Sequence, residues 1–136
     1  MTRTRLALAL TLLLPLSACE KPTYDQQLLE EVAAYNRRER PFLLADGFTR
    51  RDSLHYDTAT RTYSFCHTMT GKADNNADVA AYLNKENREH LLHELQGSIE
   101  MIPLKEQGIR IRYVYYSEST GEAMAEFVFT PRDYNP

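Results

Sequence analysis

Two histidines lie in a stretch that is rich in carboxylates, which makes them the residues of this sequence that most resemble metal ligands. His90 and His93 are three positions apart, with Glu86, Glu89 and Glu94 around them. That spacing brings two side chains within reach on a helix, but metal-binding helices more often use a spacing of four. Zinc needs three or four protein ligands, and the sequence suggests no others. We therefore expect no metal or other cofactor, with His90 and His93 as the candidates if a metal binds.

Cys66 and His67 are neighbours in the sequence, and a thiol with an imidazole is the pair of side chains that a cysteine nucleophile and its general base require. The residues around them alternate between polar and apolar, which is typical of a strand, and adjacent strand residues point to opposite faces. The two side chains then cannot form a catalytic hydrogen bond. The chain also has no glycine-rich phosphate loop and no G-x-S-x-G motif. We expect a protein that is not an enzyme, and keep a metal- or thiol-dependent hydrolase as the alternative.

Arginine, tyrosine and apolar residues share one face of the last two predicted strands. The chain has nine tyrosines, and tyrosine and arginine are enriched in protein–protein contacts. Aromatic residues also favour strands without any contact role, because they suit half-buried positions in a sheet. The face is nevertheless too apolar to be wholly solvated, so we predict that it is either partly covered or a contact surface for a partner. Its members are Arg110, Arg112, Val114, Tyr116, Met124, Glu126 and Val128.

A first helix is predicted over residues 24–38. Thr23 and Gln26 match the S/T-x-x-E/Q capping box, in which each side chain satisfies a free backbone N–H at the start of a helix. Pro41 prevents continuation beyond Arg40. The stripe that should dock this helix on the rest of the protein consists of Leu28, Leu29, Val32, Ala33 and Asn36, with Tyr24 and Tyr35 at its edge.

A second helix is predicted to start at Asn75, to run to about Gln96, and to stop at Gly97. Its apolar stripe consists of Ala80, Leu83, Asn87, Leu91 and Leu95, and its opposite side of Tyr82, Glu86, Glu89 and His93. The segment that follows, residues 98–104, fits either a short strand or an irregular connection closed by Pro103.

Residues from Ser53 onward alternate with a period of two, which predicts a first hairpin that turns at residues 57–60. On its second strand, Tyr63, Phe65, His67 and Met69 share the face expected to form core. Residues 109–116 and 123–129 predict a last hairpin. A five-residue turn would pair Tyr113 with Ala125, Ile111 with Phe127 and Arg112 with Glu126.

The order of these elements is α-β-β-α-β-β. It predicts an α+β fold, with one antiparallel sheet of four to five strands and both helices on one face. The domain boundaries that follow are a single domain 24–131 and a loose C-terminal tail 132–136.

The first nineteen residues read MTRTRLALALTLLLPLSAC. Arg3 and Arg5 precede an apolar run that is too short to span a bilayer, and the run ends in Leu16-Ser17-Ala18-Cys19. This arrangement resembles the signal peptide and lipobox of bacterial lipoproteins. The resemblance implies cleavage before Cys19, which removes the segment 1–18, and a covalent lipid on Cys19 as a membrane anchor. Residues 19–23 would then form a short tether. Glu20 stands where aspartate would imply retention in the inner membrane, so the resemblance favours the periplasmic face of the outer membrane.

Charge and cysteine content narrow the choice of partners. Without Arg3 and Arg5, 14 basic residues stand against 19 acidic ones, a net charge of −5 with histidine neutral. Such a surface is unsuited to nucleic acid, which needs a basic patch. Cys66 would be left without a partner cysteine once Cys19 is lipidated. We therefore expect a small lipid-anchored periplasmic module that binds another envelope protein, as an assembly accessory, a pilotin-like factor or an inhibitor. The alternative within this class is an immunity protein against a periplasmic toxin.

Overall fold

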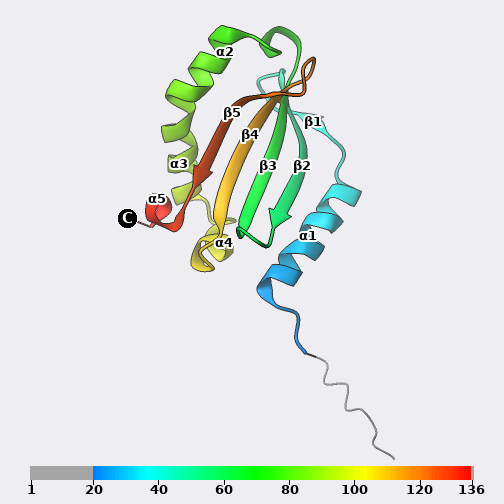
Figure 1. Cartoon of the computed structure of the whole chain (residues 1–136), viewed down its shortest axis with the longest axis vertical. Coiled ribbons are helices and arrows are strands. Elements are labelled where there is room, and N and C mark those ends of the chain that lie inside the picture. The colour runs from blue at the N-terminus through cyan, green and yellow to red at the C-terminus, as the bar shows by residue number, and fades with distance from the viewer. Residues whose placement is uncertain (1–19, 136) are drawn as a thin grey trace, which may run out of the picture.

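The structure, a computed structural model, describes residues 20–135, so the predicted signal peptide and Cys19 lie outside the described residues. Its elements, in chain order, are α1 (Tyr24–Arg38), β1 (Phe42–Leu43), β2 (Thr49–Asp57), β3 (Thr62–Met69), the 3-10 turn η1 (Gly71–Ala73), α2 (Ala77–Tyr82), the π-helical turn η2 (Leu83–Asn87), α3 (Arg88–Gly97), α4 (Ile102–Glu106), β4 (Arg110–Ser117), β5 (Ala123–Phe129) and α5 (Pro131–Tyr134). Figure 1 shows their arrangement. None of the helices within residues 20–135 is both long enough and apolar enough to cross a membrane.

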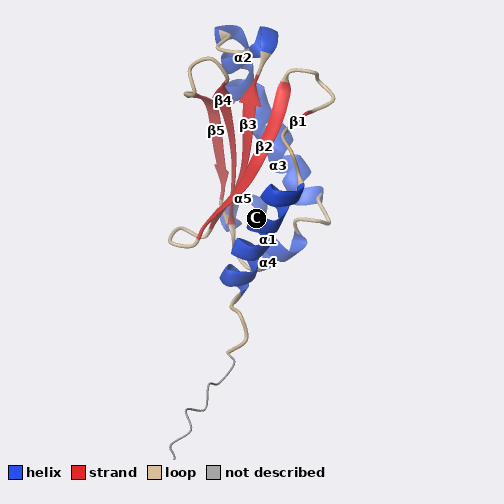
Figure 2. Cartoon of the chain, turned by 90° about the vertical axis from the view of Figure 1, so that its right-hand side faces the viewer, coloured by secondary structure: helices blue, strands red, loops and turns tan. Residues whose placement is uncertain are grey.

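The five strands form one sheet in the order β1-β2-β3-β4-β5, and α1, α3 and α4 lie on the same side of it (Figure 2). The predicted α+β class, with one sheet and both helices on one face, is confirmed. The prediction that all strands are antiparallel is wrong for one pair, because β3 and β4 run parallel. The continuous helical stretch from Ala77 to Gly97 carries the chain back to the beginning of β3, and a helical crossover of this kind is what parallel neighbours require.

Helix α1 has the predicted bounds and the predicted capping box between Thr23 and Gln26. Leu28 and Val32 are buried against the sheet, whereas Leu29 remains 42% exposed. Asn36, predicted as one member of the docking stripe, instead forms two hydrogen bonds with the backbone of β2. Its side-chain amide donates to the Leu54 carbonyl (2.8 Å) and accepts from the Leu54 N–H (2.9 Å). Asn36 thus takes the place of a neighbouring strand at the edge of β2, where β1 has already ended.

The second helix begins at Asn76 rather than Asn75, because the Asn76 side chain accepts from the backbone N–H groups of Asp78 and Val79. Asn75 has a positive φ of 49° and stays outside the helix. The predicted apolar stripe is confirmed at its leucines: Leu83, Leu91 and Leu95 are buried.

Residues 98–101 form an irregular connection, one of the two predicted alternatives, but Pro103 does not close it, because Ile102–Glu106 form the short helix α4. Pro103 lies in the first turn of that helix, where proline costs no backbone hydrogen bond. Lys105 then donates its ammonium group to the carbonyl oxygens of Leu95 (2.9 Å) and Gln96 (3.0 Å). This contact stabilises the carboxyl end of α3.

The last hairpin keeps the predicted faces but not the predicted register. Tyr113 pairs with Phe127 instead of Ala125, and a bulge between Tyr115 and Tyr116 accounts for part of the shift. Arg112 therefore lies diagonally from Glu126, yet the predicted ion pair forms, with 2.8 Å between Arg112 Nε and Glu126 Oε1.

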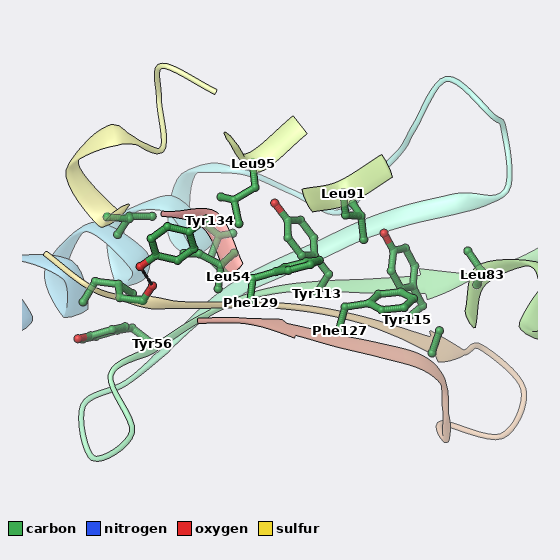
Figure 3. Close-up of a cluster of buried hydrophobic side chains, with 14 of the residues drawn as sticks. Leu54, Tyr56, Leu83, Leu91, Leu95, Tyr113, Tyr115, Phe127, Phe129 and Tyr134 are labelled. Atoms are coloured by element: carbon green, nitrogen blue, oxygen red, sulfur yellow. Dashed lines mark hydrogen bonds between the residues drawn. The ribbon is translucent and has the colours of Figure 1, made fainter. Parts of the chain in front are cut away.

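The predicted loose tail is wrong for the residues that the structure describes. A capping box between Thr130 and Asp133 starts the helix α5. This helix buries Tyr134, which is 4% exposed and donates its hydroxyl to the Ile109 carbonyl at 2.7 Å (Figure 3). The aromatic ring of Tyr134 closes the core at the end of the sheet where β4 begins, so α5 is part of the packed domain.

Candidate functional site

A groove of about 1040 Å³ lies between the helices and the sheet. Helix α1 contacts the sheet at β2, and the helical stretch from α2 to α3 lies along β5 at the other margin (Figure 1). The middle of the sheet is therefore only partly covered. Side chains of α1, β2, β3, β4 and the segment from α2 to α4 line the groove. Concave, mostly apolar spaces of this kind are the usual sites of ligand binding.

The floor of the groove is a set of aromatic rings from the two parallel strands β3 and β4. Phe65 stacks on Tyr113 with 5.0 Å between ring centroids, and His67 stacks on Tyr115 at 4.8 Å. These contacts follow from the register, which places Phe65 beside Tyr113 and His67 beside Tyr115. Burial raises the pKa of Tyr113 to about 12, so its phenol stays neutral at physiological pH. The floor therefore offers flat apolar surface.

Arg51 of β2 brings a positive charge into this floor. Its guanidinium carbon lies 5.4 Å from the centre of the Phe65 ring. Within residues 20–135 it forms no salt bridge, and its buried Nε has no hydrogen-bond partner. Its neighbour Arg50 differs in both respects, since it pairs with Asp52 (2.6 Å) and Glu118 (2.8 Å) on the opposite face. Arg51 is thus a cation without a counter-ion in the described structure.

A β-bulge explains why Arg51 faces the groove and why the sequence analysis missed it. The register between β2 and β3 shifts between Arg51 and Ser53. Counting back from Leu54 by strict alternation would place Arg51 on the opposite face of the sheet. The extra residue of the bulge reverses this assignment. The signal that could have raised the question is three consecutive charged residues, Arg50 to Asp52, directly before the predicted strand that begins at Ser53.

His67 is the second polar group of the floor. It lies directly across from Arg51 in the ladder between β2 and β3, and it is 2% exposed. Its Nδ1 atom has no partner within the described residues. Burial, together with the positive charge of Arg51, lowers the pKa of His67 to about 4. The imidazole is therefore neutral at pH 7, with one nitrogen that donates and one that accepts.

Carboxylates surround the mouth of the groove. Arg51 is the only arginine or lysine among the described lining residues, whereas five acidic residues border the opening. All five are exposed: Glu31, Asp46, Asp78, Glu94 and Glu100. One positive charge at the floor and several negative charges at the rim disfavour ligands that carry many negative charges.

Comparison with known proteins places this groove within a family. The profile of the family described as "Domain of unknown function (DUF8479)" matches residues 23–125. The chain belongs to the DUF8479 family. The matched range of this DUF8479 domain contains every residue that lines the groove, from Tyr24 to Tyr115.

One solved structure similar to this DUF8479 protein is a crystal structure titled as that of a "putative secreted protein" from Pseudomonas aeruginosa. It aligns with a TM-score of 0.64 at 12% sequence identity, over 84% of this chain and 99% of that one. At this identity the two chains share a fold, and nothing further follows. No curated protein matches the sequence.

The contact surface predicted from the sequence lies on the opposite face of the sheet in the DUF8479 domain. The structure does bring its residues together on β4 and β5, but Val114 is 0% exposed and cannot contact a partner. Arg112 already pairs with Glu126, and the hydrogen bond that its guanidinium donates to that carboxylate raises the pKa of Arg112. The other members, Arg110, Tyr116, Met124 and Val128, are exposed or half-buried. The role of this surface stays a prediction.

The histidine and cysteine candidates do not form a common site within the described residues of the DUF8479 domain. His90 and His93 are exposed on α3, and His90 Nε2 lies 3.1 Å from Glu94 Oε1. Among residues 20–135 no group of three or more metal-ligating side chains is assembled. Cys66 is half-buried on the face opposite His67, and burial raises the pKa of its thiol. The separation of Cys66 from His67, predicted from strand alternation, is confirmed.

Proposed function

We propose that this DUF8479 protein is a lipid-anchored binding protein of the bacterial envelope, and that it binds an apolar ligand in the groove between α1 and the stretch from α2 to α3. The observation that carries the proposal is the groove itself, with an aromatic floor and one unpaired cation. Its volume is at the upper end of the range of about 300–1,000 Å³ that ligand sites occupy.

The anchor part of the proposal rests on the resemblance of Leu16-Ser17-Ala18-Cys19 to a lipobox. The similar Pseudomonas aeruginosa protein, titled a "putative secreted protein", supports an envelope location. Lipidation of Cys19 would leave Glu20, Lys21 and Pro22 between the anchor and the start of the α1 capping box. Three residues reach at most about 10 Å, so the domain would lie against the periplasmic face of the outer membrane.

Replacing Cys19 by alanine tests the anchor. We expect the wild-type protein to incorporate labelled palmitate and to fractionate with the outer membrane, and Cys19→Ala to incorporate none. Cys66→Ala is the matched control, because it removes the other cysteine and should label like wild type. Globomycin, which blocks lipoprotein signal peptidase, should also stop maturation. Label that persists in Cys19→Ala would contradict the proposal.

Two valine-to-tryptophan variants test which face binds. Val79 lines the groove and Val128 lies on the opposite face, and both are half-buried. We expect Val79→Trp to weaken the binding of a neutral apolar dye such as Nile red at least about tenfold, because the indole ring fills the groove. Val128→Trp should bind the dye like wild type. The reverse result would assign binding to the surface around Arg112 and Tyr116, and so favour the protein partner predicted from the sequence.

A further inference from the structure

We infer that the ligand of the groove is a long-chain acyl carboxylate, whose carboxylate pairs with the guanidinium of Arg51 while its hydrocarbon chain lies along the aromatic floor. This inference rests on the proposed binding function and adds the chemical class of the ligand. Four features of the described residues lead to it.

The first feature is the unsatisfied charge of Arg51. A buried or half-buried guanidinium is costly unless an anion pairs with it, and Arg51 has no such partner within residues 20–135. The planar fork of a guanidinium matches a carboxylate, which can accept two parallel hydrogen bonds from it. A ligand carboxylate above Phe65 would supply the missing counter-ion.

The second feature is that the unpartnered polar atoms of the floor form one spot. Arg51 and His67 are direct cross-strand partners, and the buried atoms without hydrogen-bond partners in the described structure belong to these two residues. Aromatic side chains, among them Tyr63, Phe65 and Tyr113, make up the floor around them. One polar spot in a long apolar groove matches a ligand with one polar end.

The third feature is the acidic rim, which sets the charge of that polar end. Exposed carboxylates such as Glu31, Asp46 and Glu94 would repel a head group with several negative charges. A single carboxylate that reaches Arg51 avoids most of this repulsion. The floor also disfavours an extended peptide, because β3 is paired along its whole length with β2 and β4 and has no free backbone groups for an added strand.

The fourth feature is the position of one end of the groove. Tyr24, the first residue of α1, lines the groove next to the tether. Arg61 holds this end together, with Nε 3.3 Å from Asp25 of α1 and Nη1 3.1 Å from the carbonyl of Gln107, just after α4. The segment between α3 and α4 also lines the groove. Within this segment, the apolar residue Ile99 is 80% exposed. A domain tethered at this end would present the groove to the bilayer, which is the source of acyl chains.

The test compares laurate with dodecanol as competitors of Nile red on the full mature chain. We expect laurate to displace the dye at lower concentration than dodecanol. Arg51→Met should weaken laurate binding about 10- to 100-fold, as expected for the loss of a charge-assisted hydrogen-bonded pair, and weaken dodecanol binding much less, because a neutral hydroxyl forms only an ordinary hydrogen bond with the guanidinium. Arg51→Lys should restore part of the affinity. Arg112→Met, which removes an arginine of the opposite face, should bind like wild type.

The outcomes separate this inference from the function on which it rests. If laurate displaces Nile red no better than dodecanol, or if Arg51→Met binds laurate like wild type, the carboxylate assignment is wrong while the groove remains a binding site. If Nile red does not bind, or if neither competitor displaces it, the proposed function and the inference fail together. Circular dichroism of each variant establishes that the comparison is made between folded proteins.

Discussion

Replacing Tyr134 by alanine is expected to lower the free energy of unfolding by about 3–5 kcal/mol, the usual cost of removing a buried aromatic ring. The ring is 4% exposed, and its hydroxyl donates to the Ile109 carbonyl at 2.7 Å. Urea denaturation of the two proteins, followed by circular dichroism, measures the difference. A loss of this size would show that the last turn of the chain is part of the core.

Two control variants separate the contribution of the Tyr134 ring from that of its hydroxyl group and from that of the helix around it. Tyr134→Phe keeps the ring and removes only the hydroxyl, so it should cost about 1–2 kcal/mol through the unpaired Ile109 carbonyl. Arg132→Ala changes an exposed residue of the same short helix and should cost little. Equal and small effects of Tyr134→Ala and Arg132→Ala would mean that residues 131–135 do form a loose tail.

Acidification should destabilise the protein through His67, by about 3 kcal/mol between pH 6.5 and pH 4. Burial and the charge of Arg51 lower the pKa of His67 from 6.5 to about 4 in the folded state. As the pH falls, the unfolded state therefore takes up this proton first, and each pKa unit of difference is worth about 1.4 kcal/mol. The contribution of His67 is complete above pH 6.5, decreases through this window and is lost below about pH 4.

His67→Phe isolates this contribution, because phenylalanine can keep the stacking on Tyr115 and has no titrating nitrogen. The charged groups that act on His67 from neighbouring elements, Arg51, Asp52 and Asp46, are unchanged in the variant. We expect the stability of His67→Phe to depend less on pH than that of wild type between pH 6.5 and pH 4. Parallel pH profiles of the two proteins would show that the folded state protonates His67 as readily as the unfolded state does.

Helix α1 and the stretch from α2 to α3 were predictable because their signals are local. The capping box of Thr23 and Gln26 specifies the start of α1, and Pro41 limits how far it can extend. The stripe of Leu83, Leu91 and Leu95 needs only the helical period. The faces of the strands were predictable for the same reason, since alternation by two is a property of neighbouring residues.

The parts that were not predicted depend on residues far apart in the sequence. The parallel pairing of β3 with β4 follows from the position to which the helical stretch from α2 to α3 returns the chain. The residue pattern within either strand does not indicate whether its neighbour runs parallel or antiparallel. Tyr134 could not be placed, because the carbonyl that it contacts belongs to Ile109, 25 residues earlier. The capping box of Thr130 and Asp133 was the available local sign of α5.

The candidate site was missed for a different reason, because one extra residue in β2 interrupts the regular alternation of its side chains. Sequence reasoning identified His67 on the inner face of β3 but assigned it to the core, and it did not connect His67 with Arg51. The bulge at Arg51 and Ser53 brings the two side chains into direct pairing on the helix side of the sheet. A bulge that turns a charged residue toward an apolar groove lowers stability locally, and such departures from regular patterning are most often found at functional sites.

Native mass spectrometry of the protein purified from bacterial membranes tests the central claim most directly. Wild type and Arg112→Met should each carry, in part of the population, the added mass of one long-chain carboxylic acid, and Arg51→Met should lack it. Gas-phase release of that species would identify the acid. Wild-type protein that carries no added acid, or Arg51→Met that retains it as wild type does, would contradict the account.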